Sequence, residues 1–182
     1  WLKNIEGNAR IEGEDEWSDI YIPSAFDGYE PGKNIFFRTN FFIGGKRSSE
    51  RSYKLLFYGV NYKCNVKVND VFIENHSSPN YFEINLSSDD LNFSETNTLL
   101  IEVNNKLTDN TIPSRMQVNG WKNYGGIFRD VYLIINSQIH ISDTDIKYYF
   151  NSDYSKVNAE ITAEITDNNF IEPPFFSILK IK

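Results

Sequence analysis

Apolar and polar residues alternate with a period of two along several segments of the chain. In residues 63–69, Cys64, Val66 and Val68 would face one side of a strand, with lysines and asparagines on the other side. The same alternation recurs in three further segments, residues 81–86, 99–104 and 157–165. A period of two is typical of strands with one buried face, so these segments predict antiparallel sheets.

Other segments are more continuously apolar. Residues 53–60 contain a single charged residue and predict a strand that is buried on both faces. Residues 35–43 are rich in Phe and Ile and predict another strand. Residues 17–22 carry Trp and Ile at anchoring positions and predict a short strand that Pro23 ends.

Turn-forming residues separate the predicted strands. Asn69 and Asp70 lie between two strand segments and predict a hairpin with a two-residue turn. Residues 27–32 and 44–49 have the composition of polar loops. Residues 1–16 are polar and acidic, and we interpret them as a solvated lead-in. Short strands with frequent turns and no helical period predict an all-β sandwich.

The amino-acid composition is consistent with β-strands and argues against one class of function, nucleic-acid binding. Aromatic residues make up 15% of the chain, including 14 Phe and 11 Tyr, which favours strands and a packed core. The net charge of −7 argues against nucleic-acid binding. No apolar run has the length of a membrane span. The chain lacks a signal-peptide pattern, so we expect a mature or trimmed form. Cys64 alone excludes an internal disulfide, and the compartment stays open between periplasmic or secreted and cytoplasmic.

Residues 123–134 carry the most distinctive pattern, Asn-Tyr-Gly-Gly-Ile-Phe-Arg-Asp-Val-Tyr-Leu-Ile. Gly125 and Gly126 permit backbone angles and close approaches that a Cβ would forbid. The apolar residues that follow are evenly spaced, which would place Arg129 on the apolar face of one strand. A charge on such a face needs a partner, so we expect Arg129, like Tyr124, to be a bonded structural anchor.

This stretch resembles the end of the N-terminal sugar-binding domain of family 2 glycoside hydrolases, which include β-galactosidases, β-glucuronidases and β-mannosidases. Other segments resemble that domain in the same order: residues 17–24, Phe37-Arg38 with Phe41, residues 56–60, 66–69, 75–76, 81–84 and 103–105, and Ile112-Pro113. Asp70 departs from the family, which usually has glycine at this turn position. The resemblance therefore covers residues 17–135.

The resemblance implies the domain organisation. Residues 1–136 are expected to form a galactose-binding-like jelly-roll β-sandwich, and residues 137–182 the first strands of an immunoglobulin-like β-sandwich. The second segment has sequence for about three strands, whereas such a sandwich needs about seven. We therefore expect an incomplete second domain.

The chain is not expected to carry catalytic residues. Glycoside hydrolysis needs two carboxyl groups, which in this family are glutamates of a later (β/α)8 barrel of about 250 residues. Asp89 and Asp90 are adjacent and predict a solvated turn. His76, expected to be a hydrogen-bonded loop residue, does not form a metal-site spacing with His140 and Cys64. No metal or cofactor is expected, and no activity from this chain alone.

The loop before residue 123 supplies side chains of the kinds that bind sugars. Sugar rings stack on aromatic faces, while amide and charged groups bind their hydroxyls. The candidate carbohydrate-binding residues are Arg115, Asn119, Trp121, Lys122 and Asn123. The resemblance implies an aspartate three residues before Asn-Tyr that helps hold the sugar, and Gly120 occupies that position here. An equally weighted interpretation is that Trp121 only packs the loop against the sandwich.

Three functions follow from this reading of the sequence. The first is the front of a β-glycosidase, which supports the catalytic barrel and helps bind a β-glycoside, with a galactoside as the default. The second is a free-standing carbohydrate-binding module. The third is a purely structural sandwich that mediates assembly, which the loss of the acid at Gly120 favours. Enzymes of this family often form homo-oligomers, but the sequence fixes no subunit count.

Overall fold

The computed structural model of the chain describes residues 5–26, 32–117, 123–167 and 175–179. It divides into two compact units. Unit 1 comprises residues 1–47 and 53–134, and unit 2 comprises residues 48–52 and 135–182. The described residues form β-strands and one short 3-10 helix, so the expected all-β fold class is confirmed.

The elements of the first part of the chain, up to the end of β11, follow one another with short connections. They are β1 (Ile5–Ile11), β2 (Ser18–Ile22), β3 (Ser24–Phe26), β4 (Asn34–Phe42), β5 (Arg51–Phe57), β6 (Lys63–Val68), β7 (Val71–Ser77), β8 (Phe82–Leu86), β9 (Thr96–Asn104), the 3-10 helix η1 (Arg115–Gln117), β10 (Gly125–Ile127) and β11 (Val131–Ser137).

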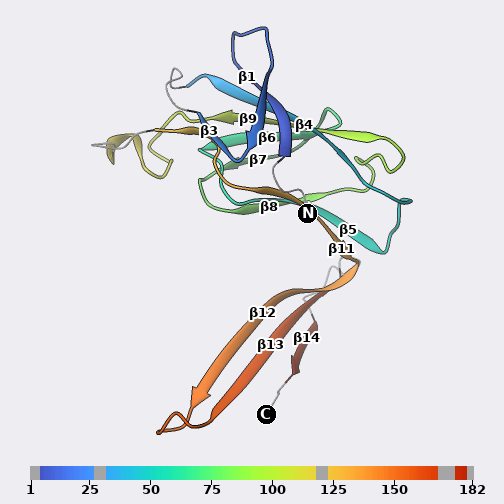
Figure 1. The fold of residues 1–182 in the computed structure, drawn as a ribbon, viewed down its shortest axis with the longest axis vertical. Coiled ribbons are helices and arrows are strands. Elements are labelled where there is room, and N and C mark those ends of the chain that lie inside the picture. Colours follow the sequence, from blue (N-terminus) through green and yellow to red (C-terminus); the bar gives the residue numbers. More distant parts are fainter. Residues whose placement is uncertain (1–4, 27–31, 118–122, 168–174, 180–182) are drawn as a thin grey trace. The chain divides into compact units, whose positions relative to one another are not determined.

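These strands build a sandwich. Six of them form one sheet in the order β2-β1-β4-β9-β6-β7, and a three-stranded sheet has the order β11-β5-β8 (Figure 1). A two-stranded sheet, β10-β3, adds to them. Within the six-stranded sheet β9 lies near the centre and pairs antiparallel with both β4 and β6. β9 thus lies between two strands, β4 and β6, that both precede it in the sequence.

The core lies between the two larger sheets. Cys64, Val66 and Val68 of β6 are all buried, as their alternation predicts. They belong to one cluster with Leu55 and Phe57 of β5 in the opposite sheet. Burial of a large apolar side chain contributes about 1.5–3 kcal/mol each, so this shared core is the main stabilising feature of unit 1.

The predicted hairpin is confirmed. Asn69 and Asp70 both have positive φ angles, 51° and 66°, and connect β6 to β7 with Val68 opposite Val71. Aspartate tolerates this left-handed region better than most residues, so it can occupy the second position of the turn. The Asn69 amide also donates to Oδ1 of buried Asn97 at 2.8 Å, which ties the turn to β9.

The solvated lead-in expected at residues 1–16 is wrong for residues 5–11, whereas residues 12–16 are exposed as expected. Residues 5–11 form β1, which lies inside the sheet between β2 and β4. Ala9 is buried, and a Cβ on Gly7 would lie 2.6 Å from the main-chain oxygen of Arg38. The strand is held mainly by main-chain pairing and close approach, which leave little hydrophobic pattern in the sequence.

Two further expectations are corrected. The segment 53–60 is not a strand buried on both faces, because β5 ends at Phe57 and its second face is only half-buried. His76 is not a loop residue but lies in β7, where its ring stacks on Phe82 with centroids 3.7 Å apart. The expected turn at Asp89 and Asp90 is confirmed, and Asp89 forms an ion pair with Arg47.

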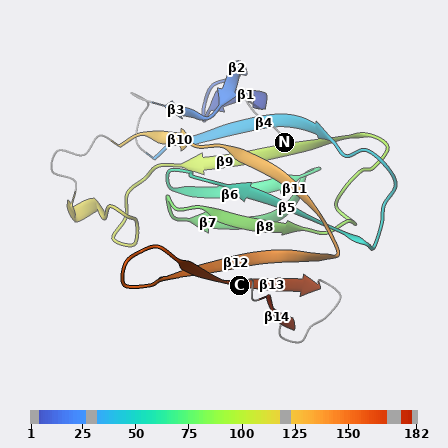
Figure 2. The same cartoon turned by 60° about the horizontal axis from the view of Figure 1, so that its bottom comes forward.

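Unit 2 contains a three-stranded antiparallel sheet, β12 (Ile139–Phe150), β13 (Val157–Asp167) and β14 (Phe175–Leu179), in that order (Figure 2). Several apolar side chains of β12 are exposed, among them Ile139, Ile141, Tyr148 and Phe150. The assignment of this segment to an immunoglobulin-like domain, and the boundary at residues 136/137, stay predictions.

Candidate functional site

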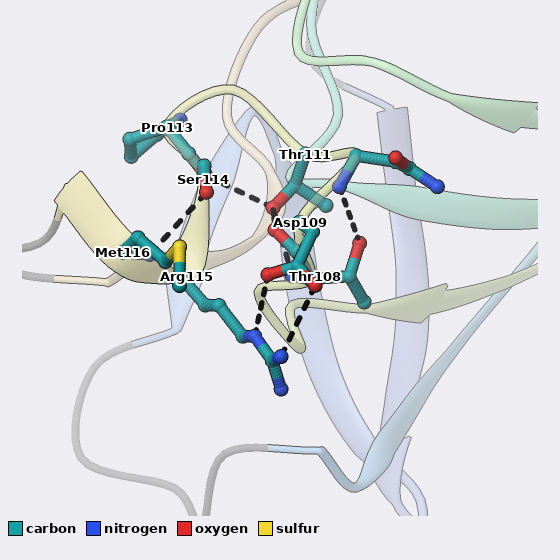
Figure 3. Close-up of polar contacts among 8 residues, drawn as sticks. Thr108, Asp109, Thr111, Pro113, Ser114, Arg115 and Met116 are labelled. Atoms are coloured by element: carbon teal, nitrogen blue, oxygen red, sulfur yellow. Dashed lines mark hydrogen bonds and ion pairs between the residues drawn. The ribbon is translucent and has the colours of Figure 1, made fainter.

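The loop that follows β9 begins with a compact polar turn around Thr111. The buried Thr111 Oγ1 accepts a hydrogen bond from the Thr108 main-chain N–H at 2.9 Å and lies 2.9 Å from the Pro113 carbonyl oxygen (Figure 3). The main-chain N–H of Arg115 donates to the Thr108 carbonyl at 3.0 Å. These bonds fix the direction in which the chain enters η1.

Arg115, a candidate carbohydrate ligand, is exposed and paired with a carboxylate. Its guanidinium faces Asp109, with Nε 2.5 Å from Oδ1 and Nη2 3.1 Å from Oδ2 (Figure 3). A two-point contact of this kind fixes the plane of the guanidinium. An exposed pair adds only about 0–1 kcal/mol to stability, so its main effect is to orient Arg115.

Asn123, another candidate, closes the loop. Its Nδ2 donates to the main-chain oxygen of Asn105 at 2.9 Å, and Asn105 Nδ2 lies 3.4 Å from the main-chain oxygen of Asn123. Asn105 is 1% exposed, and its Oδ1 lies 3.5 Å from the Gly32 N–H. We call this reciprocal pair the asparagine clasp. The Asn123 Nδ2 therefore holds the base of the loop in the structure rather than facing solvent.

The Tyr-Gly-Gly step runs between two other segments. β10 pairs with β3, and on its other side Asn61 donates its N–H to the Gly126 oxygen at 3.0 Å and its Nδ2 to the Tyr124 oxygen at 3.2 Å. Gly126 has a φ of +114°, and a Cβ there would lie 2.7 Å from the Ser24 oxygen. Gly125 is buried, whereas the Tyr124 side chain is 41% exposed.

The expected place of Arg129 on a buried strand face is wrong. The strand is interrupted between Ile127 and Val131, and Arg129 is exposed with its Cζ 5.9 Å from the Phe128 ring centroid. The Phe128 ring occupies the space above Gly59, where a Cβ would come within 2.6 Å of it. The evenly spaced apolar residues therefore belong to two strands separated by a bend, not to one continuous strand.

Arg129 belongs to a surface feature that the sequence did not suggest. An open groove of about 360 Å³, the aromatic groove, is lined by Pro23, Tyr58, Phe128, Arg129, Asp130 and Tyr132. The Tyr58 and Tyr132 rings meet edge to face with centroids 5.7 Å apart. Flat aromatic faces beside a cation and a carboxylate can bind a sugar or a protein surface. The sequence feature that could have indicated this groove is the presence of outward-facing tyrosines near the Tyr-Gly-Gly stretch.

Within the aromatic groove, Tyr132 is tied to the acid beside it. Its hydroxyl donates to Asp130 Oδ2 at 3.1 Å. This hydrogen bond to the carboxylate, together with burial, raises the pKa of Tyr132 above its usual value. Tyr132 therefore stays a neutral donor at physiological pH, and the Asp130 carboxylate is held on one side of the groove.

Three candidate ligands, Asn119, Trp121 and Lys122, lie with Gly120 outside the described residues. Their sugar-binding role stays a prediction. Of the remaining candidates, the structure shows Arg115 held by Asp109 and Asn123 held in the asparagine clasp. The described part of the chain contains no helix able to cross a membrane and no group of three or more metal-ligating side chains arranged for a metal ion.

Comparison with known proteins finds the same fold in glycoside hydrolases. A candidate β-galactosidase from Bacteroides fragilis matches 91% of this chain with a TM-score of 0.73 and 19% identity. A glycosyl hydrolase family 2 member from Bacteroides cellulosilyticus matches 90% with a TM-score of 0.72 and 17% identity. A β-D-glucuronidase of Dictyoglomus thermophilum matches 91% with a TM-score of 0.71 and 20% identity.

This chain spans only part of those proteins: 28%, 24% and 32% of their respective lengths. No protein-family model matches the sequence, and neither does any curated protein. The similarity to this group of enzymes is thus confirmed at the level of the fold, for a region that makes up about a quarter to a third of each of them.

Proposed function

We propose that this chain is the N-terminal part of a family 2 glycoside hydrolase, in which unit 1 supports a catalytic barrel and contributes to binding of a β-glycoside. One observation carries the proposal. The fold match runs over about nine-tenths of the chain, through both the sandwich and the strands that follow it, in enzymes three to four times as long. The ordered sequence resemblance, from residue 17 to residue 135, supports the same assignment.

The catalytic step would belong to the rest of the protein. The two carboxyl groups that glycoside hydrolysis requires are carried in this family by the barrel. The role of unit 1 is to present a rigid surface to that barrel. The aromatic groove supplies the residue types that dominate such contacts, tyrosine and arginine, at Tyr58, Arg129 and Tyr132.

For the substrate we propose a β-galactoside first and a β-glucuronide second. The Asn-Tyr-Gly-Gly-Ile version of the motif suggests the galactoside. The similar structures bear both activities in their names. Gly120 stands where the family has a sugar-binding aspartate, so contact with the sugar in this domain would fall to neighbouring loop residues such as Asn119 and Trp121.

The test is to detect the native polypeptide with an antibody raised against this chain and to assay the purified native protein. We expect a band several times larger than the 21.2 kDa of this chain. The native protein should hydrolyse p-nitrophenyl β-galactoside or p-nitrophenyl β-glucuronide, and the 182-residue chain neither. A native band of 21.2 kDa would overturn the proposal and favour the free-standing sugar-binding module or the assembly sandwich.

The proposed contact through the aromatic groove has its own test in the native enzyme. Arg129→Ala should lower the temperature at which catalytic activity is lost, because an interface arginine would be removed. Arg47→Ala, which removes another exposed arginine outside the groove, is the matched control. Equal inactivation temperatures for both variants and the unmodified enzyme would rule out this contact.

A further inference from the structure

A second groove lies on the outer face of the six-stranded sheet, away from the buried core. It has a volume of about 440 Å³, and its lining includes side chains of β4, β9, β6 and β7. These four strands run side by side (Figure 2). A groove that reaches from β4 to β7 therefore crosses three strand spacings, about 14 Å. We call it the amide groove because asparagines dominate its lining.

The strand register places its polar side chains in two neighbouring rows. In one row Asn34 is opposite Asn104, and Asn104 is opposite Lys63. In the other row Glu102 is opposite Asn65, and Asn65 is opposite Asn75. Residues opposite one another across antiparallel strands have side chains on the same face. The two rows therefore form one polar surface.

Within each row, one side chain is hydrogen-bonded to another and holds it in place. Asn104 Nδ2 donates to Asn34 Oδ1 at 2.6 Å and to the Gly32 oxygen at 2.9 Å, while its Oδ1 accepts the Lys106 N–H. Asn65 Nδ2 donates to Glu102 Oε2 at 3.0 Å. These bonds fix the orientation of both pairs before any ligand arrives.

The remaining polar atoms have no hydrogen-bond partner among the described residues. They are Asn34 Nδ2, Asn65 Oδ1, the second carboxylate oxygen of Glu102, the Asn75 amide and the Lys63 ammonium. The surface thus presents donors beside acceptors, of which Asn34, Asn65 and Glu102 are held in place by the bonds above. A hydroxyl group is both donor and acceptor, so a polyhydroxylated chain suits this array.

Other ligand classes fit less well. The lining combines one carboxylate, Glu102, with two lysines, Lys63 and Lys106, so a phosphate or another simple anion would meet repulsion as well as attraction. A protein partner would need an apolar anchor, and lysine and glutamate are depleted at the centres of such interfaces. The described residues that line the groove include no Phe, Tyr or Trp, so they offer a protein partner no such anchor.

We infer that the amide groove binds a short neutral oligosaccharide, whose hydroxyls accept hydrogen bonds from Asn34, Lys63 and Asn75 and donate hydrogen bonds to Asn65 Oδ1 and Glu102. This goes beyond the proposed function, because it gives unit 1 a glycan site of its own on the face of the sheet. The inference does not depend on hydrolysis, since binding to this surface is measured without any reaction.

The experiment is a titration of the 182-residue chain, followed by the NMR signals of its side-chain amides. The probes are β-1,4-linked galactotetraose, mannotetraose and xylotetraose, each to roughly 10 mM, and inorganic phosphate as the anion probe. At least one tetraose should shift the amide signals of Asn65 and Asn75. Shifts with phosphate and none with any tetraose, or no shift with any probe, would overturn the inference.

Variants assign the binding to the groove. Lys63→Ala combined with Asn75→Ala should weaken binding of that tetraose about tenfold, since both side chains would lose a hydrogen bond to it. Lys67→Ala is the matched control, because Lys67 lies on the same strand and face but outside the groove. It should change the dissociation constant less than about twofold. Equal affinity of the double variant and the control would also overturn the inference, and neither result would affect the proposed hydrolase.

Discussion

Asn105 and Asn123 each direct their side-chain amide to the main-chain oxygen of the other. The pair spans the loop that holds the candidate sugar ligands, at the junction between β9 and β10. Reciprocal contacts of this kind fix two backbone segments at once, because each residue is donor and acceptor. The loop between them therefore starts and ends at positions that the sandwich defines.

Removal of either side of the asparagine clasp should destabilise unit 1. Asn105→Ala is expected to lower the free energy of unfolding by about 2 kcal/mol and Asn123→Ala by about 1 kcal/mol, because Asn105 is the more buried and contacts Gly32 as well. Urea unfolding of both single variants and the double variant measures these values. A double variant whose loss equals the sum of the single losses would contradict the reciprocal coupling.

Gly126 should not tolerate a side chain. Gly126→Ala adds a Cβ 2.7 Å from the Ser24 oxygen and a residue with positive φ, so we expect a loss of about 3 kcal/mol or more. Gly13→Ala is the matched control, because Gly13 has a φ of +91° but open space around the added Cβ. It should cost about 1 kcal/mol, from backbone conformation alone. Similar losses for the two variants in thermal unfolding would show that the β10–β3 contact is not what requires glycine.

His76 should make the protein less stable in mild acid. Burial lowers the pKa of His76 below 6.5, so the unfolded chain binds a proton in a pH range where the folded chain does not. The free energy of unfolding should therefore fall as the pH drops through about 6.5 towards the folded-state pKa. The difference between the unmodified chain and His76→Phe, which can still stack on Phe82, isolates this effect. A constant difference between about pH 7.5 and pH 5.5 would refute it.

Cys64 should be unreactive while the protein is folded. Burial raises the pKa of its thiol to about 12, and the thiolate is the reactive form. Alkylation by iodoacetamide near pH 8 is expected to be more than about 100-fold slower in the native chain than in urea. Mass spectrometry of timed samples gives both rates. Rapid native labelling would mean that β6 opens far more often than its core position suggests.

Much of unit 1 could be predicted from the sequence, because its buried residues alternate with polar ones. Cys64, Val66 and Val68 mark β6 in this way, and the Asn69-Asp70 turn follows from the preference of these residues for positive φ. In such segments the hydrophobic pattern and the backbone conformation depend on the same few local residues.

The exceptions have a common physical cause, namely contacts with distant residues. Between Glu6 and Ile11 of β1 the one buried residue is the small Ala9, and the strand depends on its close approach to β4, which no local pattern records. The bend at Arg129 follows from the position of the Phe128 ring over Gly59, about seventy residues earlier in the chain. His76 is half-buried, and its ring stacks on Phe82 in the other sheet.

The candidate site was predictable only in part. The choice of Asn123 came from a motif, but its bond to Asn105 required the fold. The aromatic groove and the amide groove both combine residues from several strands, and their members are ordinary polar or aromatic residues when read one at a time. These residues form continuous surfaces only through the cross-strand register, which cannot be read from the sequence.

The position of β9 near the centre of its sheet has a consequence for the chain as it is being made. The ribosome releases β4 and β6 before β9, yet these two strands meet only through β9. Until then each has an unpaired edge beside exposed apolar residues, a state that favours association with other chains. A nascent chain that stops before Thr96 would keep both edges open, whereas one that has released Asn104 can complete the six-stranded sheet.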